Sequence, residues 1–167
     1  MEVVISISPE IARSILRNPV HLLAFGLGSG LAPKAPGTFG TLAAVPLYLL
    51  LAQLPLPIYL LVLVLAFGLG IWLCDKTARD LGVHDHGGIV WDEFVGFWLT
   101  MVAAPAGWLW ILLGFLLFRL FDILKPFPIN WFDRHIKGGM GIMLDDALAG
   151  SFAWLVLQLL RLAMPSA

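Results

Sequence analysis

The chain alternates long apolar runs with short polar segments. Residues 35–74 contain no Asp, Glu, Lys, Arg or His, and about 20 apolar residues suffice for a helix to cross a bilayer. Pro55 and Pro57 interrupt this run, because proline lacks a backbone donor and disfavours the helical conformation of the preceding residue. We therefore predict a hairpin of two transmembrane helices over residues 41–54 and 58–74.

Two further apolar runs follow. Residues 94–118 carry no charge but are interrupted by Pro-Ala-Gly at 105–107, which favours a second hairpin with shorter arms. The alternative is one kinked crossing over 94–118, which would place the flanking polar loops on opposite faces of the membrane. Residues 147–160 predict a final crossing that leaves the C-terminus outside. The glycine-rich run 20–32 is too short to span and favours a re-entrant or interfacial segment.

The composition argues against a soluble globular domain. Of the 167 residues, 60% are hydrophobic and 13% charged, and the mean hydropathy is +0.92, whereas an ordinary soluble domain is roughly half apolar and a quarter charged. We predict an all-α fold, a polytopic integral membrane helical bundle of about four to five transmembrane helices. It forms one domain, residues 1–167, with a cytoplasmic helix over 1–19 and the membrane bundle over 20–164.

Charge placement indicates the orientation and limits the partners. Lys and Arg side chains gather in the N-terminal segment and in the polar loops 75–93 and 122–146, while the turns that the hairpins place on the other side are uncharged. Positive residues accumulate in cytoplasmic loops, so these segments are predicted to be cytoplasmic. A formal net charge of −1 argues against a nucleic-acid partner. Cys74 is the single cysteine and excludes an internal disulfide.

Three acidic clusters lie at predicted boundaries between loops and helices, and the hairpins would bring them to the cytoplasmic face. Ionisable groups at this depth are costly and mark functional sites. Clustered carboxylates repel one another unless a cation neutralises them, and ligands that are all oxygen favour Mg²⁺ or Mn²⁺. The predicted metal ligands are Asp92, Glu93, Asp122, Asp145 and Asp146.

An ordinary structural role stays open for each of these acids alone. Asp and Glu near helix N-termini are routine caps and dipole complements. Asp122 favours a site, because it follows an apolar helix and an anion is disfavoured at a helix C-terminus. Asp75 and Asp80 are interpreted as a solvated charge face with Lys76 and Arg79.

Cationic and hydroxyl side chains beside glycines are candidates for binding phosphate. Residues 34–41 read Lys-Ala-Pro-Gly-Thr-Phe-Gly-Thr and precede a predicted helix, where backbone N–H groups favour anions. Glycines also serve close packing in membranes, and basic residues also anchor helices at the interface. The predicted substrate-binding residues are Lys34, Thr38, Thr41, Lys125 and Arg134.

Carboxylates that hold a divalent cation beside cationic groups suit phosphoryl transfer to water. A covalent route finds little support, because Cys74 and Arg79 are one residue short of the cysteine-phosphatase spacing and no serine sits in a nucleophile elbow. Either Asp85 or a metal-proximal carboxylate would take the proton of the attacking water. The predicted catalytic residues are Asp85, Asp92, Glu93, Asp122 and Lys125.

Four segments together resemble a known family. They are Gly-Ser-Gly at 28–30 continuing to Gly-Thr-Leu at 40–42, His-Asp-His-Gly-Gly-Ile-Val-Trp-Asp-Glu-Phe-Val-Gly at 84–96, Phe-Arg-Leu-Phe-Asp-Ile-Leu-Lys-Pro at 118–126 and Gly-Gly-Met-Gly-Ile-Met-Leu-Asp-Asp at 138–146. Over residues 20–160 the chain resembles the phosphatidylglycerophosphatase A family. The resemblance implies a bacterial inner-membrane enzyme that requires Mg²⁺ and hydrolyses the terminal phosphomonoester of the phospholipid phosphatidylglycerophosphate, yielding phosphatidylglycerol.

Two other functions stay open on the residues alone. A lipid-headgroup phosphotransferase would also use Mg²⁺ and carboxylates in a membrane, but the chain lacks the long Asp-x-x-Asp-Gly pattern of that family. A divalent cation transporter would need carboxylates midway along a helix to form its path. The number of metal ions, the oligomeric state and the action on related phosphates are left undetermined by the sequence.

Overall fold

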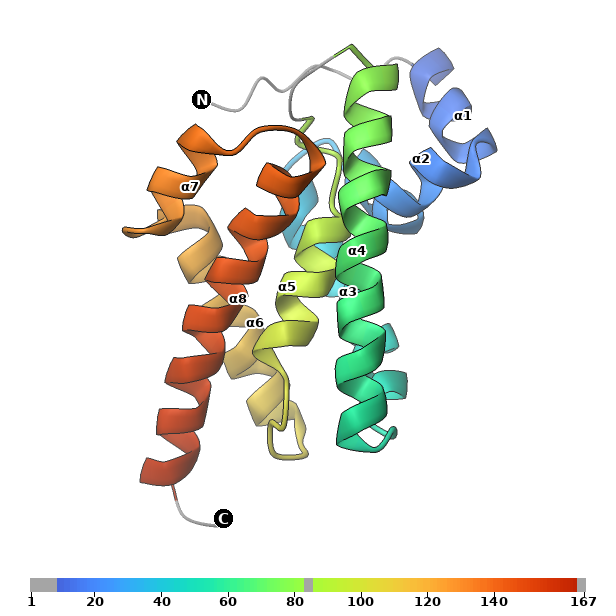
Figure 1. Cartoon of the computed structure of the whole chain (residues 1–167). Helices are drawn as coiled ribbons and strands as arrows, with labels where there is room; N and C mark the ends of the chain where they lie inside the picture. Colours follow the sequence, from blue (N-terminus) through green and yellow to red (C-terminus); the bar gives the residue numbers. More distant parts are fainter. Residues whose placement is uncertain (1–8, 83–85, 165–167) are drawn as a thin grey trace.

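The computed structural model describes residues 9–82 and 86–164, and these residues form helices and turns with no strand among them (Figure 1). Each long helix follows an apolar run of the sequence. The elements are α1 (Pro9–Arg17), α2 (Pro19–Ala24), the 3₁₀ helix η1 (Gly26–Leu31), α3 (Pro36–Leu51), α4 (Leu56–Asp80), α5 (Trp91–Thr100), α6 (Trp108–Leu124), α7 (Ile129–His135) and α8 (Gly138–Ala163).

The helices pack around α8 and the short helix α5. α8 contacts α4, α5 and α6, and α5 also packs against α3. Figure 1 shows α5 and α8 running in the same direction, with α4 and α6 running the opposite way. The side chains of Phe94, Phe97, Phe118, Met143 and Leu157 are fully buried where these helices meet. The bundle therefore has one continuous core with α5 near its centre.

Two glycines let α5 and α8 cross with their backbones in contact. A Cβ atom on Gly150 of α8 would collide with the carbonyl oxygen of Gly96 on α5, and one on Gly96 would lie 2.9 Å from the carbonyl oxygen of Asp146. Such close approach requires small residues at a helix interface. The hydroxyl of Thr100 reinforces the crossing by donating to the carbonyls of Gly96 and Gly150, at 2.9 and 3.3 Å.

The break at 105–107 is confirmed, and the alternative of one kinked crossing over 94–118 is wrong. α5 ends at Thr100, α6 begins at Trp108, and the turn between them reverses the chain (Figure 1). Side chains of α8 satisfy carbonyls in this turn. Trp154 and Gln158 both donate to the carbonyl of Val102, and Arg161 donates to that of Ala103. The turn thus meets the requirement that irregular backbone in an apolar environment be paired.

Two helices of the described structure, α4 and α8, are long and apolar enough to cross a membrane. The predicted count of four to five transmembrane helices is therefore not confirmed. α3 and α6 have 16 and 17 residues and α5 has 10, which at about 1.5 Å per residue falls short of a hydrocarbon core roughly 30 Å thick. The run 20–32 forms the short elements α2 and η1, as expected of a segment that does not span.

The start of α8 differs from the prediction. The helix begins at Gly138, nine residues before the predicted start at 147, so Asp145 and Asp146 lie inside it and not before it. The glycines of this segment serve packing between helices. A Cβ on Gly139 would collide with the backbone of α4, and the N–H of Gly139 donates to Oδ1 of Asp75 at 3.2 Å. A carboxylate from α4 thus caps the first turn of α8.

The charge face on α4 is confirmed. Lys76 pairs with Asp80 at 2.5 Å and Arg79 pairs with Asp75 at 2.8 Å, both at i,i+4 spacing. Asp80 also contacts Nε2 of the buried His21 on α2, at 2.9 Å. These acids therefore connect α4 to its neighbours as well as facing solvent.

Candidate active site

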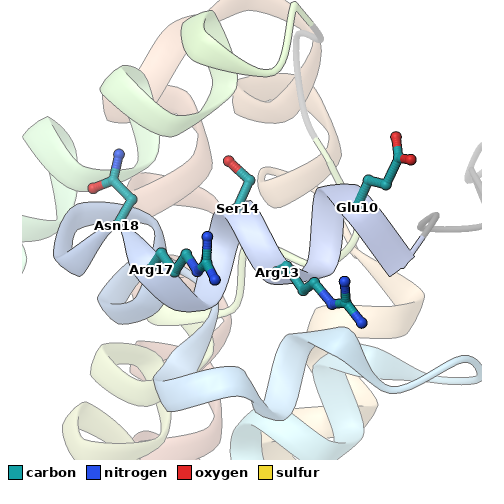
Figure 2. A pocket seen from close by; sticks show the side chains of 5 residues that line it. All are labelled: Glu10, Arg13, Ser14, Arg17 and Asn18. Atoms are coloured by element: carbon teal, nitrogen blue, oxygen red, sulfur yellow. The ribbon is translucent and has the colours of Figure 1, made fainter.

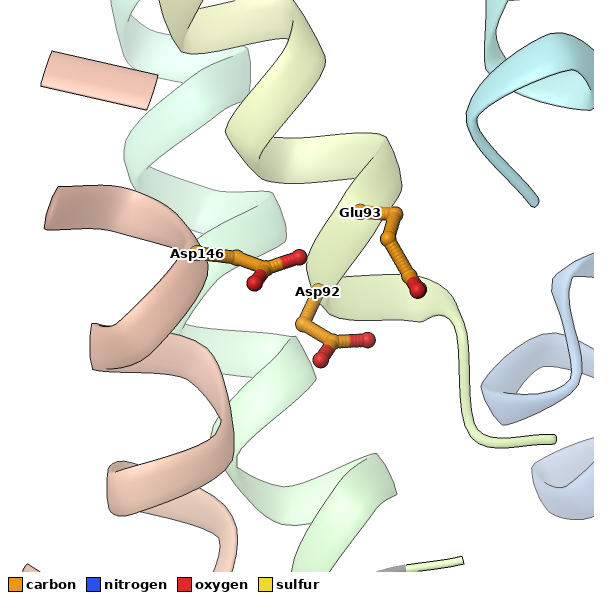
Figure 3. A group of neighbouring side chains, drawn as sticks. All are labelled: Asp92, Glu93 and Asp146. Carbon is orange, nitrogen blue, oxygen red and sulfur yellow. The ribbon is translucent and has the colours of Figure 1, made fainter. Parts of the chain in front are cut away.

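Three carboxylates from two helices meet at the end of the bundle where α5 and α8 begin. One oxygen from each of Asp92, Glu93 and Asp146 lies within 4.8 Å of the other two (Figure 3). Asp92 and Glu93 are in the first turn of α5, and Asp146 is in α8. Asp92 and Asp146 each precede a glycine of the close crossing by four residues, which is one helical turn. The crossing of α5 and α8 therefore brings the two aspartates together.

Buried oxygens in this region have no hydrogen-bond partner among the described residues. They are Oε2 of Glu93, Oδ2 of Asp146 and Oδ1 of Asp145, and the three residues are only 8%, 3% and 6% exposed. Burying a carboxylate oxygen without a partner is costly, and native structures rarely tolerate it without a functional reason. Carboxylate oxygens that lie close together without hydrogen-bond partners are the ligands that a hard divalent cation prefers.

Asp122 joins the cluster from a third helix through Arg119. Both residues lie near the end of α6, and Nη1 of Arg119 donates to Oδ2 of Asp122 at 2.5 Å. The same nitrogen lies 3.7 Å from Oε1 of Glu93 on α5. Asp122 also lies close enough to Asp146 for their like charges to interact. The guanidinium of Arg119 thus links the carboxylates of α5 and α6.

A lysine pairs with Asp145, the neighbour of Asp146 in α8. Nζ of Lys125 donates to Oδ2 of Asp145 and lies 3.4 Å from Oδ1 of Asp133 on α7. Partial burial acts to lower the pKa of Lys125, but the hydrogen bond that Lys125 donates to Asp145 and the charges of Asp145, Asp133 and Asp146 outweigh it, so the pKa lies above its ordinary value. Lys125 is therefore charged at neutral pH and already engaged with two carboxylates.

The start of α3 approaches the same region at Gly37. A Cβ on Gly37 would lie 3.0 and 3.1 Å from Nη1 and Nη2 of Arg119, and closer still to Oε1 of Glu93. Thr41 is fully buried, and its hydroxyl donates to the carbonyl of Gly37 at 2.9 Å. Thr41 therefore shapes the beginning of α3, and its hydroxyl is engaged within the helix.

The remaining predicted residues are not joined to the cluster by contacts in the described structure. Thr38 is half-buried in the first turn of α3, whereas Lys34 and Arg134 are exposed and make no ion pair with described residues. Asp85 lies outside the described residues. The sequence reasoning missed Arg119 and Asp133, although an arginine inside the apolar run of α6 is a signal of a buried functional group.

A separate pocket of about 490 Å³ lies along α1 (Figure 2). Its lining consists of side chains at the surface of this one amphipathic helix and the residue after it, and none of them contacts the carboxylates. The lining residues are Glu10, Arg13, Ser14, Arg17 and Asn18. The chemistry therefore concentrates at the carboxylate cluster and not in this pocket.

Comparisons with known proteins relate the chain to one family. The model of the family Phosphatidylglycerophosphatase A matches residues 22–161. A protein of that name from Escherichia coli K12 is 54% identical over 144 residues, 84% of each chain, and one from Haemophilus influenzae is 55% identical over 143 residues, 84% of this chain and 88% of the relative.

A more distant relative carries another name. A Bacteroides thetaiotaomicron protein, provisionally named a phosphatidylinositol-3-phosphatase, is 38% identical over 148 residues, 84% of this chain and 92% of the relative. No solved structure matches the chain.

Proposed function

The chain belongs to the phosphatidylglycerophosphatase A family, and we propose that it hydrolyses the terminal phosphomonoester of phosphatidylglycerophosphate to phosphatidylglycerol and phosphate. A water oxygen forms a bond to phosphorus, the bond from phosphorus to the glycerol oxygen breaks, and that oxygen takes up a proton. The observation that carries the proposal is the convergence of Asp92, Glu93 and Asp146 beside Arg119. Such a set suits the neutralisation of charge on a phosphoryl group.

The residues that would hold Mg²⁺ are Asp92, Glu93 and Asp146, with Asp122 adjoining them. The unpaired buried oxygens of Glu93 and Asp146 support this assignment. A bound divalent cation would supply neutralisation of the phosphoryl oxygens and a lowered pKa of water. Asp145 is a further ligand in the proposal, through its Oδ1, which is buried and unpaired while Oδ2 accepts from Lys125.

The side chains around the carboxylates have separate roles in the proposal. Lys125 holds Asp145 and Asp133 in place, since its ammonium is engaged with both. Lys34 and Thr38, near the start of α3, contact the lipid headgroup, and Arg134 assists from α7. A carboxylate of the cluster, or Asp85, accepts the proton of the attacking water.

We propose further that the chain is a multi-pass protein of the bacterial inner membrane whose active site faces the cytoplasm. The apolar surface of α4 supports membrane contact: Leu61, Val64 and Leu65 are each more than half exposed, and large exposed apolar surfaces mark membrane or partner contacts. Apart from Arg161 in the last turn of α8, the basic residues of the described helices lie toward the end of the bundle that holds the carboxylate cluster. The positive-inside rule supports a cytoplasmic position for this end. A phospholipid could then keep its acyl chains beside the helices while its headgroup reaches the cluster.

The test is release of phosphate from phosphatidylglycerophosphate by the purified protein in detergent, with Mg²⁺, with EDTA and with the Asp122→Ala variant. We expect release that depends on Mg²⁺ and is lost in the variant. Release without any acceptor alcohol distinguishes a phosphatase from a headgroup phosphotransferase. A folded protein that releases no phosphate with Mg²⁺ present would contradict the proposal.

A further inference from the structure

Arg119 lies beside the carboxylate cluster and has a buried N–H group, at Nε, with no hydrogen-bond partner among the described residues. We infer that Arg119 binds the terminal phosphomonoester of the substrate directly, so that it is a catalytic residue and not only a partner of Asp122 and Glu93. The inference rests on the proposed function, because it assigns a role in binding the same substrate. The sequence pattern assigned contact with the phosphate to the glycine-rich segments and Lys125. The inference assigns a direct contact to Arg119.

The two cations of the site differ in what they have left to bind. Nζ of Lys125 is paired with Asp145 and Asp133, and an ammonium has three donors. A guanidinium has five donors, and in Arg119 the hydrogen bond to Asp122 and the approach to Glu93 both involve Nη1. Nε of Arg119 is buried without a hydrogen-bond partner among the described residues. Arg119 therefore has spare donors at a place where leaving them unpaired is costly.

The shape of the guanidinium suits the ligand. Its N–H groups form a planar fork that matches two oxygens of a phosphate, and charge-assisted pairs of this kind are among the strongest in proteins. A phosphomonoester dianion approaching a cluster of carboxylates is repelled unless a fixed cation faces it. Arg119 supplies such a cation on α6, next to Glu93 on α5.

A glycine of α3 packs against the guanidinium of Arg119. Gly37 lies against Nη1 and Nη2, and a Cβ atom there would be 3.0 and 3.1 Å away. The side chain of Arg119 is 14% exposed, so it is shielded from bulk water but not sealed. A shielded guanidinium strengthens electrostatic binding, because the local dielectric is lower than in water.

The experiment separates binding of the phosphomonoester from binding of the lipid. For wild type, Arg119→Gln and Arg119→Lys, we would measure KM for phosphatidylglycerophosphate, competitive inhibition by inorganic phosphate and competitive inhibition by phosphatidylglycerol, which lacks the terminal phosphate. We expect Arg119→Gln to raise KM and to weaken inhibition by phosphate by about 10- to 100-fold, with inhibition by phosphatidylglycerol unchanged. Arg119→Lys keeps the charge but loses the fork, and should fall between the two.

Two controls keep the result specific. Arg79→Gln removes an exposed arginine of α4 and should leave all three constants unchanged, since Asp75, also on α4, is its partner among the described residues. Binding of Mn²⁺ to the substrate-free protein, followed by electron paramagnetic resonance, should be no weaker in Arg119→Gln than in wild type, because the substitution removes a positive charge near the carboxylates. Retained Mn²⁺ binding also shows that the variant is folded. If Arg119→Gln does not fold, the same measurements on Arg119→Lys replace it.

Several results would overturn the inference. An unchanged KM in Arg119→Gln, or equal weakening of inhibition by phosphate and by phosphatidylglycerol, would leave Arg119 without a direct contact to the phosphomonoester. Loss of Mn²⁺ binding from a folded variant would mean that Arg119 acts through the carboxylates instead. Failure of the wild-type protein to release phosphate would contradict the proposed function itself, which is a distinct outcome.

Discussion

The two ends of the α5 and α8 pair differ in the hydrogen bonding of their buried polar groups. The far end is the one where α5 ends and the chain turns toward α6. There the carbonyls of Val102 and Ala103 accept hydrogen bonds from side chains of α8, namely Trp154, Gln158 and Arg161. At the near end, Glu93 and Asp146 keep buried oxygens that no described residue pairs. The carbonyls at the far end have donors from α8, whereas the near end keeps carboxylate oxygens without a partner among the described residues.

This difference separates structural from functional polar residues. Pairing every polar group inside an apolar environment stabilises the fold. Residues that stay unpaired at a cost to stability are expected where a substrate or cation supplies the missing partner. Changes at the near end should therefore affect activity more than stability, and changes at the far end should do the reverse.

The largest effect is expected from Asp146→Asn. The variant removes one carboxylate of the three and should lower phosphate release by more than about 100-fold, because groups that merely support a metal ligand already contribute about 10- to 100-fold. We expect Mg²⁺ to raise the Tm of the wild-type protein, since a ligand that binds the folded state stabilises it, and we expect this increase to be lost in the variant. Steady-state kinetics and thermal unfolding in detergent, each with and without Mg²⁺, provide the measurement.

The control for Asp146→Asn is Asp80→Asn, which makes the same chemical change on the charge face of α4. It should keep both the activity and the stabilisation by Mg²⁺. Full stabilisation of Asp146→Asn by Mg²⁺ would show that this carboxylate is not part of the cation site.

Sequence patterns predicted the features that depend on neighbouring residues. The uncharged runs and the prolines located the helices and the break at 105–107. The expectation that the acidic clusters meet is confirmed for Asp92, Glu93 and Asp146. The reason differs from the expected one, because Asp146 lies eight residues after the start of α8 and meets the first turn of α5 through the crossing of the two helices.

Features that depend on distant backbone contacts were not predicted. The glycines at 138–141 suggest a loop when only the sequence is considered, but they form the first turn of α8 because α4 lies against Gly139. The pairing of Asp145 with Lys125 joins residues 20 positions apart. The link from Arg119 to Glu93 joins residues 26 positions apart, and no local pattern predicts which partner a buried arginine finds.

A smaller effect on activity is expected from Gly37→Ala. The new methyl group would lie against both Arg119 and Glu93, so these side chains must shift. Displacements of about 1 Å in an active site cost up to roughly 100-fold in rate, and we expect a loss of about 10- to 100-fold in kcat/KM with Tm little changed. Gly68→Ala is the matched control, because a Cβ on Gly68 meets no atom within 4 Å.

The two glycine variants should differ in which property they change, activity or stability. Gly68→Ala should keep full activity and raise the free energy of unfolding by about 0.5–1 kcal/mol, since alanine favours the helix. Equal kcat/KM for Gly37→Ala and wild type would mean that the start of α3 does not constrain the site.

The smallest effect on activity is expected at the far end, from Trp154→Phe and Gln158→Leu. Each variant alone leaves the carbonyl of Val102 with one donor, so each should lower the free energy of unfolding by no more than about 1 kcal/mol. The double variant leaves that carbonyl unpaired and should cost about 1–3 kcal/mol, more than the sum of the single changes. Denaturant unfolding in detergent measures the three variants, and phosphate release per folded protein should stay at the wild-type level in all of them. A loss of turnover in the folded double variant would mean that the far end also controls the geometry of the carboxylates, because α5 and α8 would then transmit the change along their length.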